Sequence, residues 1–257
     1  MTKPKTPSSK EKTINDERVK VAVQVAQGNP SGTDIGYMPA VLCHVFFPYH
    51  DPGAGLDLWY RKSGNFILSV ESTASINPIT MQPVKFGIPS GPKPRLILAT
   101  LNNIALLQQK PELYLGHSLT EFIGQHLKLN TDGRTINEVK SQLARLSTAH
   151  IQIAYDEGHG HAYQDGMRVI RGLDVWWGKD KNQRHLWGNY LRFSSDYFNA
   201  LQEHGVPLDM RALRAMSNNP VAIDLYSFLA HRLHNLKKPV SISWAACLLY
   251  TSPSPRD

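Results

Sequence analysis

Apolar side chains crowd residues 94–109, PRLILATLNNIALLQQ, on nearly every side of a helical projection. The apolar positions include Leu96, Leu101 and Ile104, which lie at helical spacing. A helix that is apolar all round is buried all round. The pattern therefore predicts a central buried helix that begins at Pro94, directly after the Pro/Gly-rich loop QPVKFGIPSGPKP.

Two later segments are apolar on one face only. SLTEFIGQHL opens with Ser118 and Glu121, and TINEVKSQLARLSTAH opens with Thr135 and Glu138. A serine or threonine followed three residues later by glutamate forms a capping box, which marks the start of a helix. We predict amphipathic helices over 118–127 and 135–150, separated by the polar turn KLNTDGR.

Alternating patterns predict the strands. Residues 36–92 are predicted to be largely β, with GYMPAVLCHVFFPYH strand-like and a hairpin that turns at Ser63, Gly64 and Asn65. ELYLG predicts a brief strand, and IQIAYDE and MRVIRGLDVWW predict two strands joined by the loop GHGHAYQDG. The segment DERVKVAVQVAQ fits a strand by its alternating valines and a helix by its acidic start, and the sequence leaves both open.

From residue 94 the predicted order is helix, short strand, helix, turn, helix, strand, loop, strand. This is the order of the winged helix, in which the third helix enters the major groove and the loop of the hairpin is the wing. After Gly188 the chain predicts a strand, two short helices, the long helix NPVAIDLYSFLAHRLHNL and a short strand KPVSISW, so the same order begins again. The predicted fold class is α+β with tandem winged-helix domains, the second incomplete.

This organisation divides the chain into four parts: a disordered or weakly ordered basic leader (1–35), a first winged-helix domain with a β-rich extension (36–187), the start of a second winged-helix domain (188–246), and a tail (247–257). The tail, CLLYTSPSPRD, matches codon for codon the translation of a string that resembles a sequencing-library adapter. We expect it to be an artefact, with the true C-terminus beyond Ala246. A complete second domain needs roughly 50–70 more residues.

The composition indicates a globular protein with a polyanionic partner. The chain of 257 residues is 41% hydrophobic and 19% charged, and 28 basic against 21 acidic residues give a net charge of +7. This balance favours nucleic acid over a membrane surface, because no basic amphipathic stretch and no membrane-length apolar run is present. Cys43 and Cys247 have no metal-ligand spacing, so a reducing cytoplasm is expected.

Several blocks of the sequence resemble plasmid replication initiators of the RepA type. The blocks are GYMPAVLC, GIPSGPKPRLIL, LYLGHSLTEFI, GRTINEVKSQLARL, GVPLDMRALRAMSNNPVAIDLYSFLAHRL and SISWAA. The resemblance covers roughly 36–246 and implies two winged-helix domains that bind repeated sites in duplex DNA at a plasmid origin. It further implies help in melting adjacent A·T-rich DNA so that host replication proteins load, no cofactor, and a first domain that serves dimer contact more than base reading.

The candidate DNA contacts at the predicted third helix are the polar residues left by its apolar face, Asn137, Lys140, Ser141 and Arg145, with Arg134 directly before the helix. Asparagine suits adenine edges, arginine suits guanine edges, and lysine suits phosphate. An ordinary solvated face explains the same residues. Since the resemblance implies little base reading by this domain, we expect backbone contacts here.

Further candidates lie in the predicted wing and after the long C-terminal helix. His159 lies in the wing loop, Arg168 and Arg171 flank it on opposite faces of one strand, and Arg232, Lys237 and Lys238 form a basic helix end. Cations suit the C-terminal end of a helix without any DNA. His159 and His161 also invite a metal site, but a Gly-rich turn lacks a framework of buried ligands, so a wing tip is the preferred interpretation.

No nucleotide-binding, zinc-protease or nucleophile-elbow motif occurs, and we expect a protein that is not an enzyme and needs no metal. Three functions compete: a plasmid replication initiator, a winged-helix autoregulator of its own promoter, and a metal-dependent hydrolase that uses the His159/His161 loop. The expected partners of the first are plasmid-origin DNA, a second copy of the chain as a homodimer, and host replication proteins, in a bacterial cytoplasm and away from membranes.

Overall fold

A computed structural model describes residues 19–30, 32–53, 55–77, 80–158, 161–174, 189–234 and 236–241. The helices are η1 (Gly32–Asp34), α2 (Ala40–His44), α3 (Pro92–Gln108), α4 (Leu119–Glu121), the π-helical turn η2 (Phe122–Leu127), α5 (Gly133–Thr148), α6 (Ser195–His204), α7 (Met210–Ala215) and α8 (Pro220–His234). The strands are β1 (Ile35–Pro39), β2 (Leu58–Ser63), β3 (Phe66–Ser72), β4 (Ser75–Ile76), β5 (Pro83–Val84), β6 (Glu112–Tyr114), β7 (Ala149–Gly158), β8 (His161–Arg168), β9 (Ile170–Asp174), β10 (Tyr190–Phe193) and β11 (Gly205–Asp209). This mixture of helices with several small sheets confirms the predicted α+β class.

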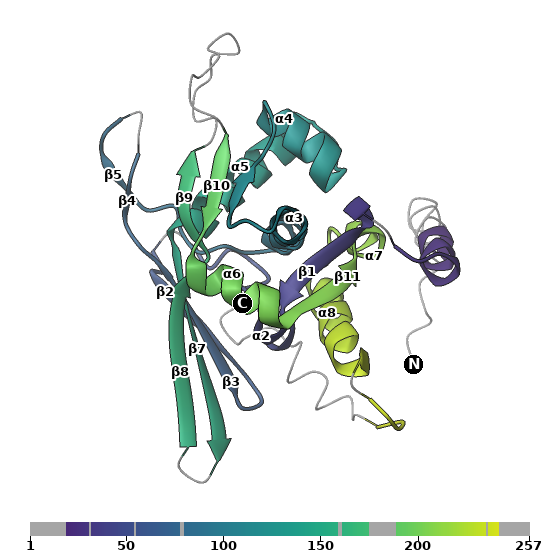
Figure 1. The fold of residues 1–257 in the computed structure, drawn as a ribbon. Helices are drawn as coiled ribbons and strands as arrows, with labels where there is room; N and C mark the ends of the chain where they lie inside the picture. The colour runs from purple at the N-terminus through teal and green to yellow at the C-terminus, as the bar shows by residue number, and fades with distance from the viewer. Residues whose placement is uncertain are drawn as a thin grey trace, which may run out of the picture.

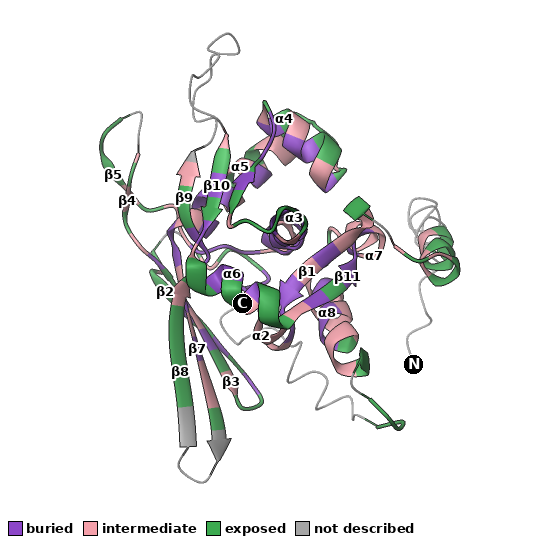
Figure 2. Cartoon of the chain, in the orientation of Figure 1, coloured by how far each residue is buried: buried purple, intermediate pink, exposed green. Residues whose placement is uncertain are grey.

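Helix α3 lies at the centre of the molecule, as its all-round apolar pattern predicts (Figure 1). Every residue from Pro94 to Ala105 is buried, and α3 contacts β1, α5, α7, β6, α8, η2 and α6. Figure 2 shows the buried positions gathered on α3 and on the faces of the elements turned toward it. A helix starts at Pro92 because proline at the first positions lacks only an N–H that the helix does not use.

An antiparallel sheet in the order β2-β3-β7-β8 forms one side of the molecule. Its inner face carries Trp59, Leu68 and Ile151, each at most 1% exposed, which pack into the core. The turn between β2 and β3 lies at Gly64 and Asn65, as predicted, and Gly64 has a positive φ of 57° that a β-carbon would disfavour. Beyond the core the hairpin β7–β8 projects into solvent (Figure 1).

The predicted wing differs from the observed hairpin in two respects. Most of GHGHAYQDG is strand, because β8 begins at His161 and pairs with β7 as far as Gly158. The predicted second strand 167–177 is divided, since β8 ends at Arg168 and β9 begins at Ile170 in another sheet. In that sheet β6 pairs with β10 and β10 with β9, so within the described residues β6 does not pair with the hairpin β7–β8.

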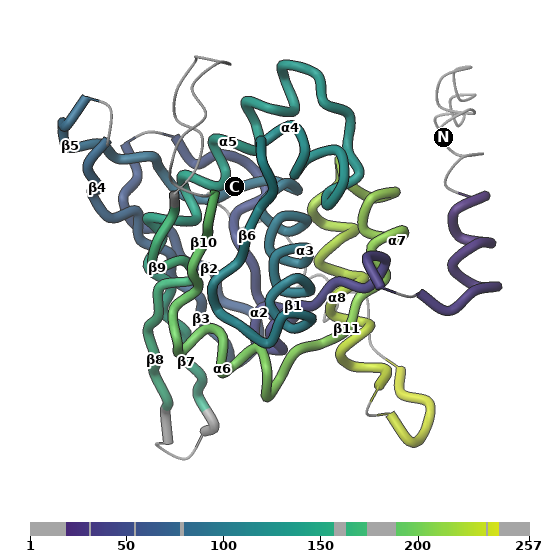
Figure 3. The backbone as a smooth tube through the Cα atoms, turned by 45° about the horizontal axis from the view of Figure 1, so that its top comes forward, coloured from purple at the N-terminus to yellow at the C-terminus, as the bar shows by residue number. Residues whose placement is uncertain are grey.

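The segment before β2 also differs from the prediction. GYMPAVLCHVFFPYH is strand only through Pro39, and α2 follows at once, so Cys43 is a buried helical residue and not a strand residue. Residues 19–27, for which the sequence allows strand or helix, are helical. This helix lies at the edge of the molecule in Figures 1 and 3.

The C-terminal part of the described chain packs into the same core as the central part. Strand β11 pairs with β1 from Asp209 opposite Ile35 to Gly205 opposite Pro39, and α8 contacts α2 and α3. The long helix predicted from NPVAIDLYSFLAHRLHNL is α8, in which Phe228 is buried, and DYFNALQEH forms most of α6. The division into domains at 187/188 stays a prediction, and the tail 247–257 lies outside the described residues.

Candidate DNA-binding surface

Helix α5 begins two residues before the predicted position because another side chain caps it. Asp132 is the N-cap, and its carboxylate accepts hydrogen bonds from the Thr135 N–H at 2.9 Å and the Thr135 hydroxyl at 3.0 Å. These bonds hold the pKa of Asp132 below its usual range. The predicted capping box of Thr135 and Glu138 is therefore wrong, and Glu138 instead accepts from Arg134. The Ser118 cap is confirmed, since Glu121 N–H donates to its hydroxyl at 3.0 Å.

The apolar face of α5 packs against α3 and leaves a polar edge in solvent. Val139, Leu143 and Leu146 are each at most 1% exposed, as their spacing predicts. Asn137 and Ser141 are exposed on another side of the helix. The predicted division of α5 into a buried apolar face and an exposed polar face is confirmed.

The basic candidates on α5 differ in their surroundings. The Arg134 side chain is 89% exposed and forms an ion pair with Glu138, with 2.9 Å between Nε and Oε1. Lys140 is half-buried. Arg145 turns toward the protein: its Nη2 lies 2.6 Å from Oδ2 of Asp51, and its Nη1 donates to the Ile88 carbonyl at 2.9 Å. The hydrogen bond from Arg145 also lowers the pKa of Asp51.

The candidates of the wing are only partly described. Arg168 is exposed at the end of β8, opposite His150 of β7. Arg171 lies on β9, so the expectation that both arginines occupy opposite faces of one strand is wrong. His159 lies outside the described residues. Among the residues that the structure describes, no group of three or more His, Cys, Asp or Glu side chains is placed to hold a metal ion.

The basic end of α8 is separated from α5 by the central helix (Figures 1 and 3). Lys237 and Lys238 are exposed, while Arg232 is half-buried with its guanidinium 5.9 Å from the Phe228 ring centre. His231 is half-buried as well, with its ring 4.8 Å from that of His44. Burial lowers the pKa of His44 to about 4 and also lowers that of His231.

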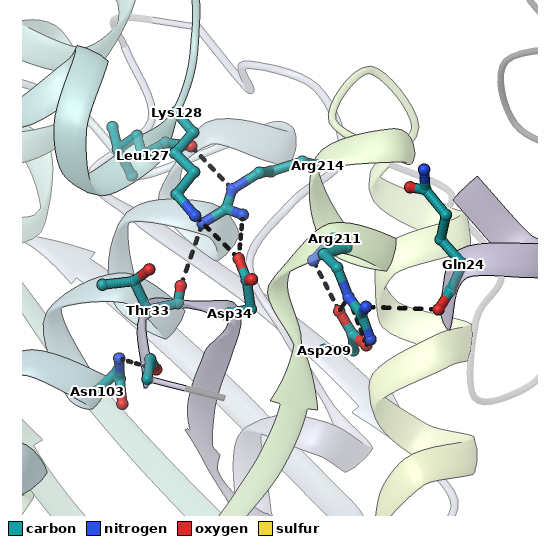
Figure 4. A network of polar contacts seen from close by, with 10 residues as sticks. Gln24, Thr33, Asp34, Asn103, Leu127, Lys128, Asp209, Arg211 and Arg214 are labelled. Carbon is teal, nitrogen blue, oxygen red and sulfur yellow. Dashed lines mark hydrogen bonds and ion pairs between the residues drawn. The ribbon is translucent and has the colours of Figure 1, made fainter. Parts of the chain in front are cut away.

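A network of ion pairs that the sequence does not reveal joins η1, η2 and α7 (Figure 4). Oδ1 of Asp34 lies 3.0 Å from Nζ of Lys128 and 3.1 Å from Nη1 of Arg214. Nearby, Arg211 pairs with Asp209 at 2.6 Å and donates to the Gly28 carbonyl at 2.8 Å, which holds the N-terminal helix 19–27 beside α7. Asp34 and Lys128 are 94 residues apart, so no local pattern signals their contact.

A buried ion pair connects α3 to α8. The Arg95 side chain is fully buried, and its Nε and Nη2 lie 2.6 and 2.7 Å from the two carboxylate oxygens of Asp224. Arg95 also donates to the carbonyls of Gly91 and Phe47, at 2.6 and 2.8 Å. The sequence signal for this pair is a single charge in each of two apolar helical stretches, PRLIL and VAIDLY.

Helix α5 presents Asn137 and Ser141 to solvent, and the hairpin β7–β8 follows it directly. The family model described as plasmid encoded RepA protein matches residues 88–245, and the chain belongs to this family. No helix among the described residues is long and apolar enough to cross a membrane.

The chain is similar to two crystal structures of domains 2 and 3 of RctB. For the selenomethionine derivative, the TM-score is 0.49 at 13% identity over 76% of this chain and 71% of that chain. For the second structure, the TM-score is 0.44 at 12% identity over 77% of this chain and 70% of that chain. A search of curated proteins finds no match.

Proposed function

We propose that this protein is a plasmid replication initiator that binds repeated sites in duplex DNA at an origin and promotes local opening of the duplex. The observation that carries the proposal is the family match, which begins at residue 88 within the 85–91 loop and extends past α8, and so includes the whole of α5 and its hairpin. The net charge of +7 supports a polyanionic ligand.

In this proposal α3, η2, α5 and the hairpin β7–β8 act as a winged-helix unit, and a second unit begins at α8. Helix α5 approaches the major groove with Asn137 and Ser141 on its exposed edge, and Arg134 and Lys140 supply phosphate contacts. The hairpin brings Arg168 to the neighbouring backbone. Arg145 contributes by holding α5 to the 85–91 loop through Ile88, because its guanidinium is engaged inside the protein.

The proposed opening of the duplex needs no catalytic group, metal or cofactor. Binding at several repeats bends or strains the DNA, and A·T-rich steps yield at the lowest cost. We further propose that the active assembly includes a second copy of the chain and host replication proteins, all in the bacterial cytoplasm where plasmid DNA is found.

The test is fluorescence anisotropy with origin-repeat duplexes, across a series of salt concentrations, for the wild type and two arginine variants. Arg134→Ala should weaken binding and make the log–log salt slope shallower by about 0.9, the contribution of one phosphate. Arg192→Ala is the matched control, because it also removes an exposed arginine paired with a glutamate, with 2.7 Å between Arg192 and Glu112.

Equal effects of the two substitutions would contradict the placement of DNA along α5, and a wild type without affinity for duplex DNA at low salt would contradict DNA binding altogether. A plasmid that carries only a minimal origin separates initiation from regulation of the protein's own promoter. Replication of that plasmid when the full-length natural gene is supplied supports the initiator, and its failure contradicts it.

A further inference from the structure

One carboxylate oxygen of Asp34 lies between two cations at the turn that leads into α5. Lys128 Nζ and Arg214 Nη1 both approach Oδ1 of Asp34, at 3.0 and 3.1 Å, and Figure 4 shows the two side chains converging on it from η2 and α7. A single anionic oxygen between an ammonium and a guanidinium is also the arrangement in which lysine and arginine bind a phosphate oxygen.

Arg214 is held in place without the help of Asp34. Arg214 Nε donates to the Leu127 carbonyl at 3.1 Å, and its Nη2 donates to the Thr33 carbonyl at 3.3 Å. Lys128 follows η2 directly, with a left-handed φ of 53°, so its backbone position is fixed by the end of the turn. If the carboxylate moves away, Arg214 keeps its orientation through these two carbonyl bonds.

The carboxylate is accessible enough for another anion to replace it. The side chains of Asp34 and Lys128 are 32% and 42% exposed, and that of Arg214 is 14% exposed. Exposed ion pairs contribute little to stability because water and salt screen them. The hydrogen bond from Lys128, with help from Arg214, nevertheless holds the pKa of Asp34 below its usual range, so the carboxylate is ionised at neutral pH.

We propose that Lys128 and Arg214 form a phosphate-binding site for the backbone of duplex DNA, and that Asp34 occupies this site when DNA is absent. The inference rests on the proposed function and adds an internal competitor to it. Lys128 lies five residues before the start of α5, in the turn between the second and third helices, and such turns lie close to the DNA backbone when the third helix enters the groove. Bound DNA replaces the Asp34 carboxylate with a phosphodiester oxygen.

The competitor has a consequence for selectivity. Every duplex, whatever its sequence, must displace Asp34 before it gains this contact, so non-specific DNA loses part of the electrostatic attraction that +7 of net charge provides. An origin sequence that makes additional contacts with α5 can displace the Asp34 carboxylate more easily. The N-terminal segment that carries Asp34 thereby lowers binding to random DNA more than binding to the origin.

Asp34→Asn and Asp57→Asn test the proposal as a matched pair. Both raise the net charge by one, and Asp57 pairs with Lys85 at 2.6 Å in a different part of the chain. Anisotropy is measured with a random-sequence duplex from 50 mM to 1 M salt. For Asp34→Asn the log–log slope should steepen by about 0.9, which corresponds to binding on the order of tenfold tighter at 50 mM.

Lys128→Gln then assigns the gain to the site. It should remove most of the tighter binding from the Asp34→Asn protein and have a smaller effect on the wild type. The asparagine variants should remain folded, because asparagine retains the shape and an acceptor oxygen of the aspartate. Circular dichroism and thermal unfolding check that each variant is folded.

The outcomes separate the two proposals. If the wild type binds duplex DNA but Asp34→Asn and Asp57→Asn give the same slope, the internal competitor is wrong and Asp34 is only a structural tie between η1, η2 and α7. A gain that persists in the Asp34→Asn, Lys128→Gln double variant also overturns the site. If no variant and no wild-type protein binds duplex DNA, the failure lies with the proposed function itself.

Discussion

Replacing Asp224 by asparagine should be among the most damaging single changes in the protein. The substitution keeps the shape of the side chain and removes its charge, which leaves the Arg95 guanidinium ionised inside the core. Arg95 is fully buried, and Asp224 supplies both of its carboxylate contacts. Breaking a buried pair by removing one partner costs about 3–5 kcal/mol, since the remaining charge has lost its compensation.

Urea unfolding followed by circular dichroism measures this cost, with a thermal melt beside it. In a domain of this size each kcal/mol lowers Tm by about 2–4 °C, so Asp224→Asn should lower Tm by roughly 6–20 °C. The control is Glu112→Gln, which breaks an exposed pair with Arg192 and should cost at most about 1 kcal/mol. The cationic ring contact of Arg95 with Phe46, at 4.6 Å, and the Gly91 and Phe47 carbonyls remain in both proteins.

Two results would refute the reasoning. A loss below about 1 kcal/mol with an unchanged denaturant slope would mean that Arg95 finds water or another acceptor, so the pair is not buried in solution. A loss equal to that of Glu112→Gln would mean that α8 contributes little to the core. The double variant Arg95→Met, Asp224→Leu should recover part of the stability, because no charge then remains without a partner.

The remaining predictions concern pH and close packing. Asp132 and Asp51 both have lowered pKa values in the folded protein, so each stabilises the fold above the ordinary value of 3.8, and this contribution is lost as the pH falls through the lower folded value. Asp132→Ala should therefore lose less stability between pH 5 and pH 2 than the wild type does. Urea unfolding across that interval measures the difference. Gly36→Ala should cost about 1–3 kcal/mol, because a β-carbon there would lie 2.5 Å from Sδ of Met210, whereas Gly55→Ala, with no atom within 4 Å, should leave Tm unchanged. Equal melting temperatures for the two glycine variants would contradict the close approach at Gly36.

The elements that were predictable from sequence are those in which burial imposes a regular spacing of apolar residues. Helix α3 is apolar on all sides and is buried from Pro94 to Ala105, and the seam of Val139, Leu143 and Leu146 identifies α5. The turn at Gly64 was predictable because glycine next to asparagine suits a tight hairpin. In each case the local sequence carries the physical cause.

The elements that the sequence predicts incorrectly also have physical explanations. Strand β8 is exposed from Tyr163 to Gly166, so no apolar alternation marks it, and only its pairing with β7 makes it a strand. The start of α5 was misplaced because Asp132 competes with Thr135 for the cap position, and both residue types suit it. A short helix interrupts GYMPAVLC after Pro39, where tertiary packing overrides the preference of the sequence for a strand.

The residues of the candidate site also divide into those that local sequence predicts and those that depend on distant contacts. Asn137 and Ser141 follow from the faces of one helix, whereas the inward turn of Arg145 depends on Asp51 and Ile88, 94 and 57 residues away. The contacts of Asp34 with Lys128 and Arg214 likewise join segments that only the folded chain brings together. Contacts between distant segments produce no periodic pattern in the local sequence, so they are not predictable from a single sequence.

The pairing of β1 with β11 and of Arg95 with Asp224 also fixes the order of events during synthesis. Residues 129 positions apart form the ion pair, so α3 leaves the ribosome long before its partner on α8 exists. At translation rates of about 5–20 residues per second, the apolar helix waits roughly 6–26 seconds for α8 to be made. During that interval the nascent chain exposes the surface that later becomes the core, and slow translation should increase its dependence on chaperones.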